Sequence, residues 1–232
     1  MVLGVGTTRL RWPLLATLTA VALVAALVLN VSGRASGNDD AERCARLAEL
    51  SAERASSDTG RGPRVAVIGD SYAFGSGLDR PARSWPSRLP GRVHVDGFPG
   101  SGFSPRASSC PGVSYADRAA AAAKGADLVV VQGGLNDVDR RGRKIRAGFK
   151  RLIRELQGYD VVVVGPATAP ARAHGVPRID SLLTRLSGAA GVRYLRMSHL
   201  DLPYLDDRLH LTQAGHVAFG QRVAKVVERR VR

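Results

Sequence analysis

The 232-residue chain is 44% hydrophobic and 23% charged, proportions that allow one folded enzyme domain behind an N-terminal segment and exclude disorder throughout. Its formal charge of +14 at pH 7 comes mainly from dispersed arginines, with local clusters only at Arg140 to Arg146 and Arg229 to Arg232. This pattern predicts a solvated basic surface, or loose attraction to anionic lipid or envelope polymer, and argues against a nucleic-acid partner.

The first predicted element is an apolar helix near the N-terminus. Residues Trp12 to Val31 carry no charge and would span roughly 30 Å as a helix, which matches the hydrocarbon core of a bilayer. Arg9 and Arg11 precede this helix and acidic residues follow it, so the positive-inside rule places the remainder outside the cytoplasm. We therefore assign residues 1–33 to a cytoplasmic stub plus a transmembrane anchor or signal peptide. The protein is expected either in the cell membrane, as a single-pass protein, or secreted.

The segment after this helix contains one of the two cysteines. Residues 34–62 are rich in Ser, Gly, Ala and charge, which is typical of a linker, and a short helix is possible over Ala41 to Arg54. Because disulfides persist outside the cytoplasm, we predict a bridge between Cys44 and Cys110; two separate buried thiols are the alternative. Residues 63–232 form the predicted folded domain.

Within this domain, short apolar runs alternate with amphipathic stretches. Five of the runs are typical of buried strands: Arg64 to Ile68, Val93 to Val95, Asp127 to Gln132, Asp160 to Val164 and Val192 to Leu195. Ile145, Phe149 and Leu152 fall on one face of a helix between them, and Thr212 is a predicted N-cap of the last helix. The alternation predicts a three-layer α/β/α domain with a parallel five-stranded sheet.

Residues suited to nucleophilic catalysis follow three of these strands. Gly69-Asp70-Ser71 ends the first strand, Asn136 and Asp137 follow the third, and Asp207 and His210 come after the last. A serine hydroxyl needs an imidazole to take its proton, and the imidazole needs a carboxylate to hold it in place. Ser71, His210 and Asp207 supply these functions, while Asn136 and backbone N–H groups can donate to a substrate oxyanion.

Taken together, these motifs resemble the GDSL or SGNH hydrolase superfamily over about Arg64 to Val227, which implies a flavodoxin-like fold. The resemblance implies Ser71 as nucleophile and as a backbone oxyanion donor, Asp207 and His210 as its catalytic partners, and Asn136 as the side-chain oxyanion donor. The remaining donor in the family is a glycine after the second strand. Gly100 is our choice by its spacing from that strand, with Gly102 as the alternative.

The resemblance further implies a serine hydrolase that cleaves carboxylic esters through an acyl-serine intermediate. Because the N-terminal segment places the domain outside the cytoplasm, the expected substrates are lipid esters or acylated envelope glycans or glycolipids. An acyltransferase of the same fold, or an inert domain that binds envelope carbohydrate or anionic polymer, is the alternative. No metal or cofactor is predicted, because no Cys/His cluster has zinc-ligand spacing and no nucleotide-binding glycine loop is present. We expect a monomer whose partners are its acyl-ester substrate and, through the N-terminal helix, the membrane.

Overall fold

The structure is a computed structural model that describes residues 39–231. The predicted membrane span or signal peptide over Trp12 to Val31 lies outside these residues. Among the residues that are described, no helix is both long and apolar enough to cross a bilayer. The chain divides into two units, Met1–Cys44 and Ala45–Arg232, and the sheet and its helices belong to the second.

The second unit is built on one six-stranded sheet with the order β1-β3-β2-β4-β5-β6. The strands are β1 Thr59–Gly60, β2 Arg64–Gly69, β3 Arg92–Gly97, β4 Leu128–Gln132, β5 Val161–Val164 and β6 Arg193–Leu195. Strands β2 to β6 are parallel and confirm the five predicted strands. The two-residue β1, which pairs antiparallel with β3, is an addition that the sequence did not predict.

Runs of valine form the central strands because both faces of the sheet are covered. In the register, Val67 of β2 lies between Val95 of β3 and Val130 of β4, and all three are buried. Successive side chains of a strand point to opposite faces, so Val67 and its neighbour Ile68 enter different hydrophobic clusters. This two-sided burial explains why the strands are continuously apolar instead of alternating.

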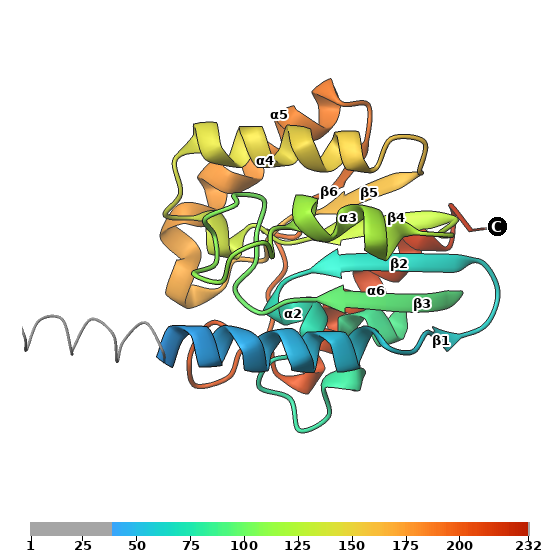
Figure 1. Cartoon of the computed structure of the whole chain (residues 1–232), viewed down its shortest axis with the longest axis horizontal. Helices are drawn as coiled ribbons and strands as arrows, with labels where there is room; N and C mark the ends of the chain where they lie inside the picture. Colours follow the sequence, from blue (N-terminus) through green and yellow to red (C-terminus); the bar gives the residue numbers. More distant parts are fainter. Residues whose placement is uncertain (1–38, 232) are drawn as a thin grey trace, which may run out of the picture. The chain divides into compact units, whose positions relative to one another are not determined.

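Helices cover both faces of the sheet and give three layers (Figure 1). One face carries α3 Tyr115–Ala123, α4 Gly142–Glu155 and α5 Val176–Ala189, and the other carries α2 Ser71–Phe74, η2 Trp85–Arg88 and α6 Gln213–Val227. Short 3-10 helices complete the fold: η1 Pro81–Arg83, η3 Leu135–Asp137 and η4 Pro170–Gly175. The predicted N-cap of α6 is confirmed, since Thr212 Oγ1 accepts from the N–H of Gly215 at 3.2 Å.

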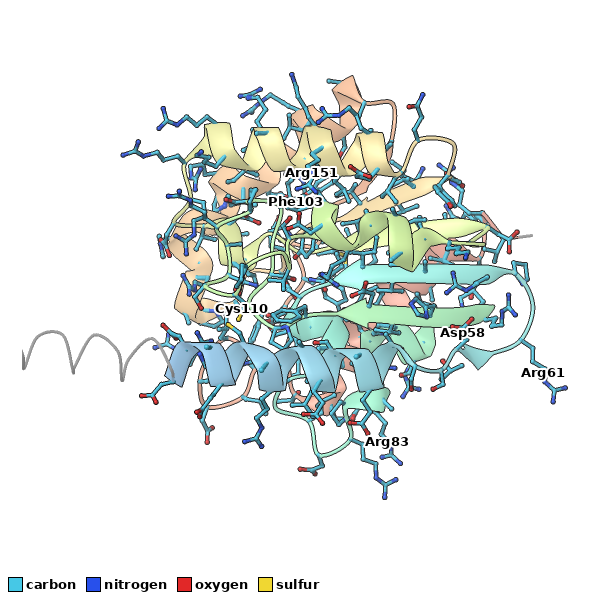
Figure 2. All side chains as sticks on the ribbon, viewed as in Figure 1. Asp58, Arg61, Arg83, Phe103, Cys110 and Arg151 are labelled. Atoms are coloured by element: carbon cyan, nitrogen blue, oxygen red, sulfur yellow. The ribbon has the colours of Figure 1, made fainter. Side chains whose placement is uncertain are left out.

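Part of the segment expected to be a linker has regular structure. Residues 39–55 are helical, and β1 follows them. Asp58, which is labelled in Figure 2, lies just before β1. Its carboxylate contacts Arg64 Nε at 3.1 Å and His94 Nδ1 at 3.0 Å. Burial alone would raise the pKa of Asp58, but these two partners lower it below its usual value. The edge of the sheet at β1 is therefore fastened by charge as well as by backbone pairing.

The predicted disulfide is confirmed, because Cys44 and Cys110 are both disulfide-bonded and the chain has no other cysteine. Cys44 belongs to the helical residues 39–55, and Cys110, labelled in Figure 2, lies in the long loop between β3 and α3. The bridge links this helical segment covalently to a loop that also carries Gly100.

Candidate active site

Ser71 lies at the first position of α2, directly after the carboxyl end of β2. The preceding Asp70 caps this short helix, since its Oδ1 accepts from the N–H of Tyr72 at 2.9 Å. The helix ends after one turn at Gly75, whose φ of +97° lies in the left-handed region that glycine adopts without strain. The sharp strand-to-helix turn leaves Ser71 partly exposed while Asp70 is fully buried.

Asp207 and His210 form a closed turn in the segment before α6. Oδ2 of Asp207 lies 2.6 Å from Nδ1 of His210, and Oδ1 accepts from the backbone N–H groups of Leu209 and His210, each at 2.9 Å. Burial alone would raise the pKa of Asp207, but these hydrogen bonds lower it, so the carboxylate is ionised at neutral pH. With Nδ1 directed at the carboxylate, Nε2 of the imidazole is left for a reacting group.

The Ser71 turn and the His210 turn meet through their neighbours in sequence. The hydroxyl of Tyr72 donates to the carbonyl oxygen of Leu209 at 2.7 Å. Within the described chain, Ser71 Oγ and His210 Nε2 have no hydrogen-bond partner, and no hydrogen bond joins them to each other. Catalytic hydrogen bonds are often long before substrate binds, so both groups remain available for reaction.

Asn136 enters the site from η3, after the carboxyl end of β4. Its Nδ2 donates to the carbonyl oxygen of Ser101 at 2.8 Å. The adjacent Asp137 is buried and accepts from the N–H groups of Phe103 and Ser104, both at 2.9 Å. These three bonds join η3 to the loop that follows β3, and so hold the amide of Asn136 near Gly100 in that loop.

Gly100 and Gly102, the two candidates for the backbone oxyanion donor, have different surroundings. Gly100 is partly exposed at a φ of +81°, and a Cβ built on it would come no closer than 3.8 Å to any neighbour. Gly102 is buried, and its Cβ would lie 2.6 Å from Asp137 Oδ2 and 2.7 Å from Ala107 Cβ. Gly100 therefore has open space for a substrate beside it, whereas Gly102 is packed inside the loop.

Arg118 of α3 organises this part of the site and was missed by the sequence analysis. Its Nη2 donates to the carbonyl oxygen of Gly69 at 2.9 Å and to Ser101 Oγ at 3.1 Å, and its Nη1 contacts the carboxylate of Asp96. The carbonyl of Gly69 also accepts from the N–H of Phe98 at 3.1 Å. Arg118 thus joins the carboxyl ends of β2 and β3. The sequence could not predict this role, because nothing in the residues around a single arginine on a helix indicates its distant partners.

Two buried carboxylic acids lie beneath these groups. Burial raises the pKa of Asp70 to about 6, although hydrogen bonds from Tyr72, Gln132 and Tyr115 oppose the rise. Burial likewise raises the pKa of Asp137 to about 7, against hydrogen bonds from Ser104 and Phe103. These two buried aspartates therefore bind protons more tightly than exposed aspartates do.

Two other histidines, His216 and His174, have partners outside the proposed catalytic groups. His216 is buried in α6, where its Nδ1 accepts from the N–H of Trp85 at 3.2 Å, and burial lowers its pKa to about 4. This hydrogen bond gives the His216 imidazole a structural role, since it joins α6 to η2. His174 is exposed on η4, 3.6 Å from Asp139. Among residues 39–231, no group of three or more acidic, His or Cys side chains is arranged to hold a metal ion.

Comparisons with known proteins match most of the folded part of the chain. The GDSL-like lipase/acylhydrolase family matches residues 67–218, more than half of the chain. The solved structures to which the chain is similar include three esterases. A carbohydrate acetylesterase from Sinorhizobium meliloti is 19% identical with a TM-score of 0.60, over 72% of this chain and 99% of the other. An inhibitor-bound aryl esterase from M. smegmatis is 17% identical with a TM-score of 0.59, over 72% and 99%.

The third solved structure is a psychrotrophic esterase from Pseudoalteromonas sp. inhibited by monoethylphosphonate, 13% identical with a TM-score of 0.58 over 72% of this chain and 97% of the other. At these identities the three structures support the fold alone. A search of curated proteins found no significant match.

Proposed function

Since the chain belongs to the GDSL-like lipase/acylhydrolase family and is an ester hydrolase, we propose that it removes acyl groups from polar envelope molecules, such as acylated glycans or glycolipids, outside the cytoplasm. Ser71 is the nucleophile, His210 its base and Asp207 the carboxylate that orients the base. The observation that carries this assignment is the Asp207–His210 pair, 2.6 Å apart, on a turn that is hydrogen-bonded to the residue after Ser71.

In the acylation step, His210 Nε2 takes the proton of Ser71 Oγ as the oxygen attacks the ester carbonyl carbon. The carbonyl oxygen becomes an oxyanion that accepts hydrogen bonds from the backbone N–H groups of Ser71 and Gly100 and from the amide of Asn136. Because one donor of Asn136 already binds Ser101, its orientation is fixed before the substrate arrives. Removing one such donor typically costs about 3–4 kcal/mol of transition-state stabilisation.

Collapse of the tetrahedral intermediate breaks the bond to the alcohol, and His210 delivers its proton to the leaving oxygen. The acyl group is then on Ser71. A water molecule loses its proton to His210, attacks the acyl carbon, and releases the carboxylic acid as Ser71 regains its proton. Asp207 stabilises the imidazolium in both halves, which its lowered pKa allows because the carboxylate stays ionised.

The surroundings of the site favour a polar substrate. A cavity of about 510 Å³ next to the His210 turn is lined by Gly77, Leu78, Asp79, Arg80, Arg83, Leu205 and Gln213. Sites for long acyl chains are lined predominantly by apolar side chains, whereas this cavity is mostly polar. A deacetylase acting on a glycan, as the similar carbohydrate acetylesterase is named, fits such walls better than a lipase does.

The disulfide supports an extracytoplasmic location. Structural disulfides persist in oxidising compartments and are rare in the cytosol. The Cys44–Cys110 bridge therefore agrees with the apolar segment Trp12 to Val31 as an export signal or anchor. A fusion of residues 1–38 to a phosphatase reporter tests this location, because the reporter is active only after export. A fusion that is expressed but inactive would contradict an extracytoplasmic location.

Hydrolysis of p-nitrophenyl esters with two to twelve acyl carbons by the purified full-length protein tests the reaction. We expect the highest kcat/KM for the two- to four-carbon esters and loss of at least 1000-fold in Ser71→Ala and His210→Asn. Ser87→Ala and His199→Asn, which alter exposed side chains outside the site, are the matched controls and are expected to retain full activity.

Two results would redirect the assignment. Equal turnover by wild type and Ser71→Ala would refute the acyl-serine mechanism. A folded wild type that is inert toward every ester, but moves an acyl group to an added alcohol or sugar, would identify an acyltransferase of the same fold instead.

A further inference from the structure

A strongly basic pocket lies beside η3, outside the groups that the reaction uses. This cavity of about 390 Å³ is lined by Ser104, Asp139 and five cationic residues, Arg106, Arg140, Arg141, Arg143 and Lys144. The five cations come from two segments, the loop after β3 and residues 140–144, which lead into α4. Part of the basic cluster at Arg140 to Arg146 that the sequence analysis noted therefore lines this pocket.

The positive charge of this pocket is not neutralised within the described chain. Its one acid, Asp139, is already paired, since Oδ2 lies 2.6 Å from Arg172 Nη1 and Oδ1 lies 3.6 Å from His174 Nε2. Arg140 donates to the carbonyl oxygen of Ala107 at 3.3 Å. The side chains of the other four cations, Arg106, Arg141, Arg143 and Lys144, have no ion pair or hydrogen bond among residues 39–231.

Two segments connect the pocket to the candidate active site. Asp139 is three residues from Asn136, so their Cα atoms are at most about 11 Å apart. The Nη2 of Arg178 donates to the carbonyl oxygens of Val138, at 2.6 Å, and Arg140, at 3.1 Å, which fixes this stretch of chain. The pocket wall and the Asn136 amide are therefore parts of one rigid turn.

On the other side, η4 connects the pocket to the His210 turn. The N–H of Ala171 donates to the carbonyl oxygen of Arg208 at 2.9 Å, and the next residue, Arg172, pairs with Asp139. In Figure 1, α4 begins at the end of the sheet where the arrows of β2 and β3 terminate. Figure 2 shows nitrogen-tipped side chains projecting from α4 at this end.

We propose that this pocket binds an oxyanion, a carboxylate or phosphate group, carried by the ester substrate. Arginine presents several N–H donors in a plane that matches carboxylate and phosphate oxygens, and a cleft lined by one sign of charge concentrates ligands of the opposite sign. This inference rests on the proposed function and names its substrate class more narrowly: polar acyl esters that also carry negative charge near the ester group.

Two ester pairs of equal chain length test the inference. The neutral p-nitrophenyl hexanoate and octanoate are compared with the mono-p-nitrophenyl esters of adipate and suberate, which differ by a terminal carboxylate. We expect the wild type to prefer the anionic partner of at least one pair by about tenfold in kcat/KM. Arg141→Gln/Arg143→Gln/Lys144→Gln should lose this preference and keep its activity on the neutral esters.

The matched control, Arg222→Gln/Lys225→Gln/Arg229→Gln, removes the same charge in and after α6 and should keep the preference. The preference should also fall in 1 M NaCl, where charges are screened within about 3 Å. An anionic-to-neutral ratio that is the same in the wild type and the pocket variant would overturn the proposal. An equal loss of preference in the α6 control would also overturn the proposal, because the preference would then come from the overall charge of the protein and not from the pocket.

A wild type that hydrolyses neither these esters nor the two- to four-carbon p-nitrophenyl esters would refute the proposed function. Calorimetry with inorganic phosphate then tests the pocket alone. Phosphate binding that is lost in the pocket variant and kept in the α6 control would support the pocket. Absence of phosphate binding to such an inert wild type would overturn it.

Discussion

The hydroxyl of Tyr72 donates a 2.7 Å hydrogen bond to the carbonyl oxygen of Leu209. Tyr72 directly follows Ser71, and Leu209 directly precedes His210, so this bond joins the segments that carry the proposed nucleophile and base. The tyrosine ring is buried between α6 side chains, making edge contacts with His216 and Phe219. Because the ring is immobile, its hydroxyl is a fixed point from which the 205–210 turn is positioned.

Replacing this hydroxyl tests its role as a positioning group. We expect Tyr72→Phe to lower the free energy of unfolding by about 1–2 kcal/mol, since a partly buried carbonyl loses its partner. The same change should lower kcat on a short-chain p-nitrophenyl ester by about tenfold with little change in KM. Chemical denaturation and steady-state kinetics measure the two effects.

Tyr159→Phe is the matched control for Tyr72→Phe, since the hydroxyl of Tyr159 has no hydrogen-bond partner in the described chain. It should change neither stability nor kcat. Unaltered kcat in Tyr72→Phe, despite the loss of stability, would show that the bond stabilises the fold without positioning His210.

Arg208 is the one non-glycine residue of the described chain with a positive φ, at +57°, and it stands between Asp207 and His210. The left-handed region costs an L-residue about 1–2 kcal/mol. Arg208→Gly should leave the free energy of unfolding within about 0.5 kcal/mol of wild type, because relief of strain offsets the greater freedom of the unfolded chain. Arg208→Val, which adds a β-branch, should lower it by more than about 1 kcal/mol and reduce kcat. Equal stability of the two variants would argue against strain at this turn.

Asp70 predicts a pH dependence of stability with a definite sign. Its pKa is about 6 in the folded protein and 3.8 in the reference state, so the folded form holds the proton more tightly. Asp70 therefore destabilises the fold increasingly as pH rises from about 4 to about 6, by up to about 3 kcal/mol, and by a constant amount above that range. Asp70→Asn removes this titration and keeps the helix cap.

Urea denaturation of Asp70→Asn and wild type between pH 4 and 8 gives the free energy of unfolding of each protein. The quantity of interest is the value for the variant minus the value for wild type. We expect this difference to grow with pH up to about 6 and then to level off. The amide also offers a donor to Gln132 Oε1, a buried acceptor that has no partner in the structure. A difference that stays flat from pH 4 to 8 would mean that Asp70 keeps an ordinary pKa in the fold.

Reduction of the disulfide should destabilise the protein by about 2–4 kcal/mol, because the bridge restricts the unfolded chain. Thermal unfolding with and without dithiothreitol measures this loss. In Cys110→Ser the reductant should have no effect, and the melting temperature should equal that of the reduced wild type. A reductant-dependent shift in Cys110→Ser would assign the effect to something other than the bridge.

The strands were predictable from sequence because two-sided burial requires continuous apolar runs, and Val161–Val164 is such a run. The two-residue strand β1 was not, since Thr59 and Gly60 carry no apolar signal, and the contacts of the preceding Asp58 with Arg64 and His94 form only in the folded chain. The same distinction holds for the helices: Thr212 signals its own cap locally, whereas the packing of α3 against the sheet does not show in its alanine-rich sequence.

In the candidate site, the chemical groups were recognisable because their motifs are short and local. The Asp207–His210 pair lies within four residues, and its contact follows from one turn. The groups that hold the motifs in place act over long stretches of chain: Tyr72 on Leu209, and Arg118 on Gly69. Such contacts depend on how the sheet and helices come together, so no local pattern reports them. The basic pocket is of the same kind, since Arg106 and the start of α4 meet only in the folded protein.

The sheet ends on both sides in very short strands, β1 with two residues and β6 with three. An unpaired strand edge is a template on which a second chain can add a strand, and long exposed edges promote aggregation. A second copy of the protein could pair with only a few backbone groups at either edge of this sheet. The net charge of +14 also makes two copies repel each other. The brevity of β1 and β6 thus limits edge-to-edge association between copies of the protein at high concentration.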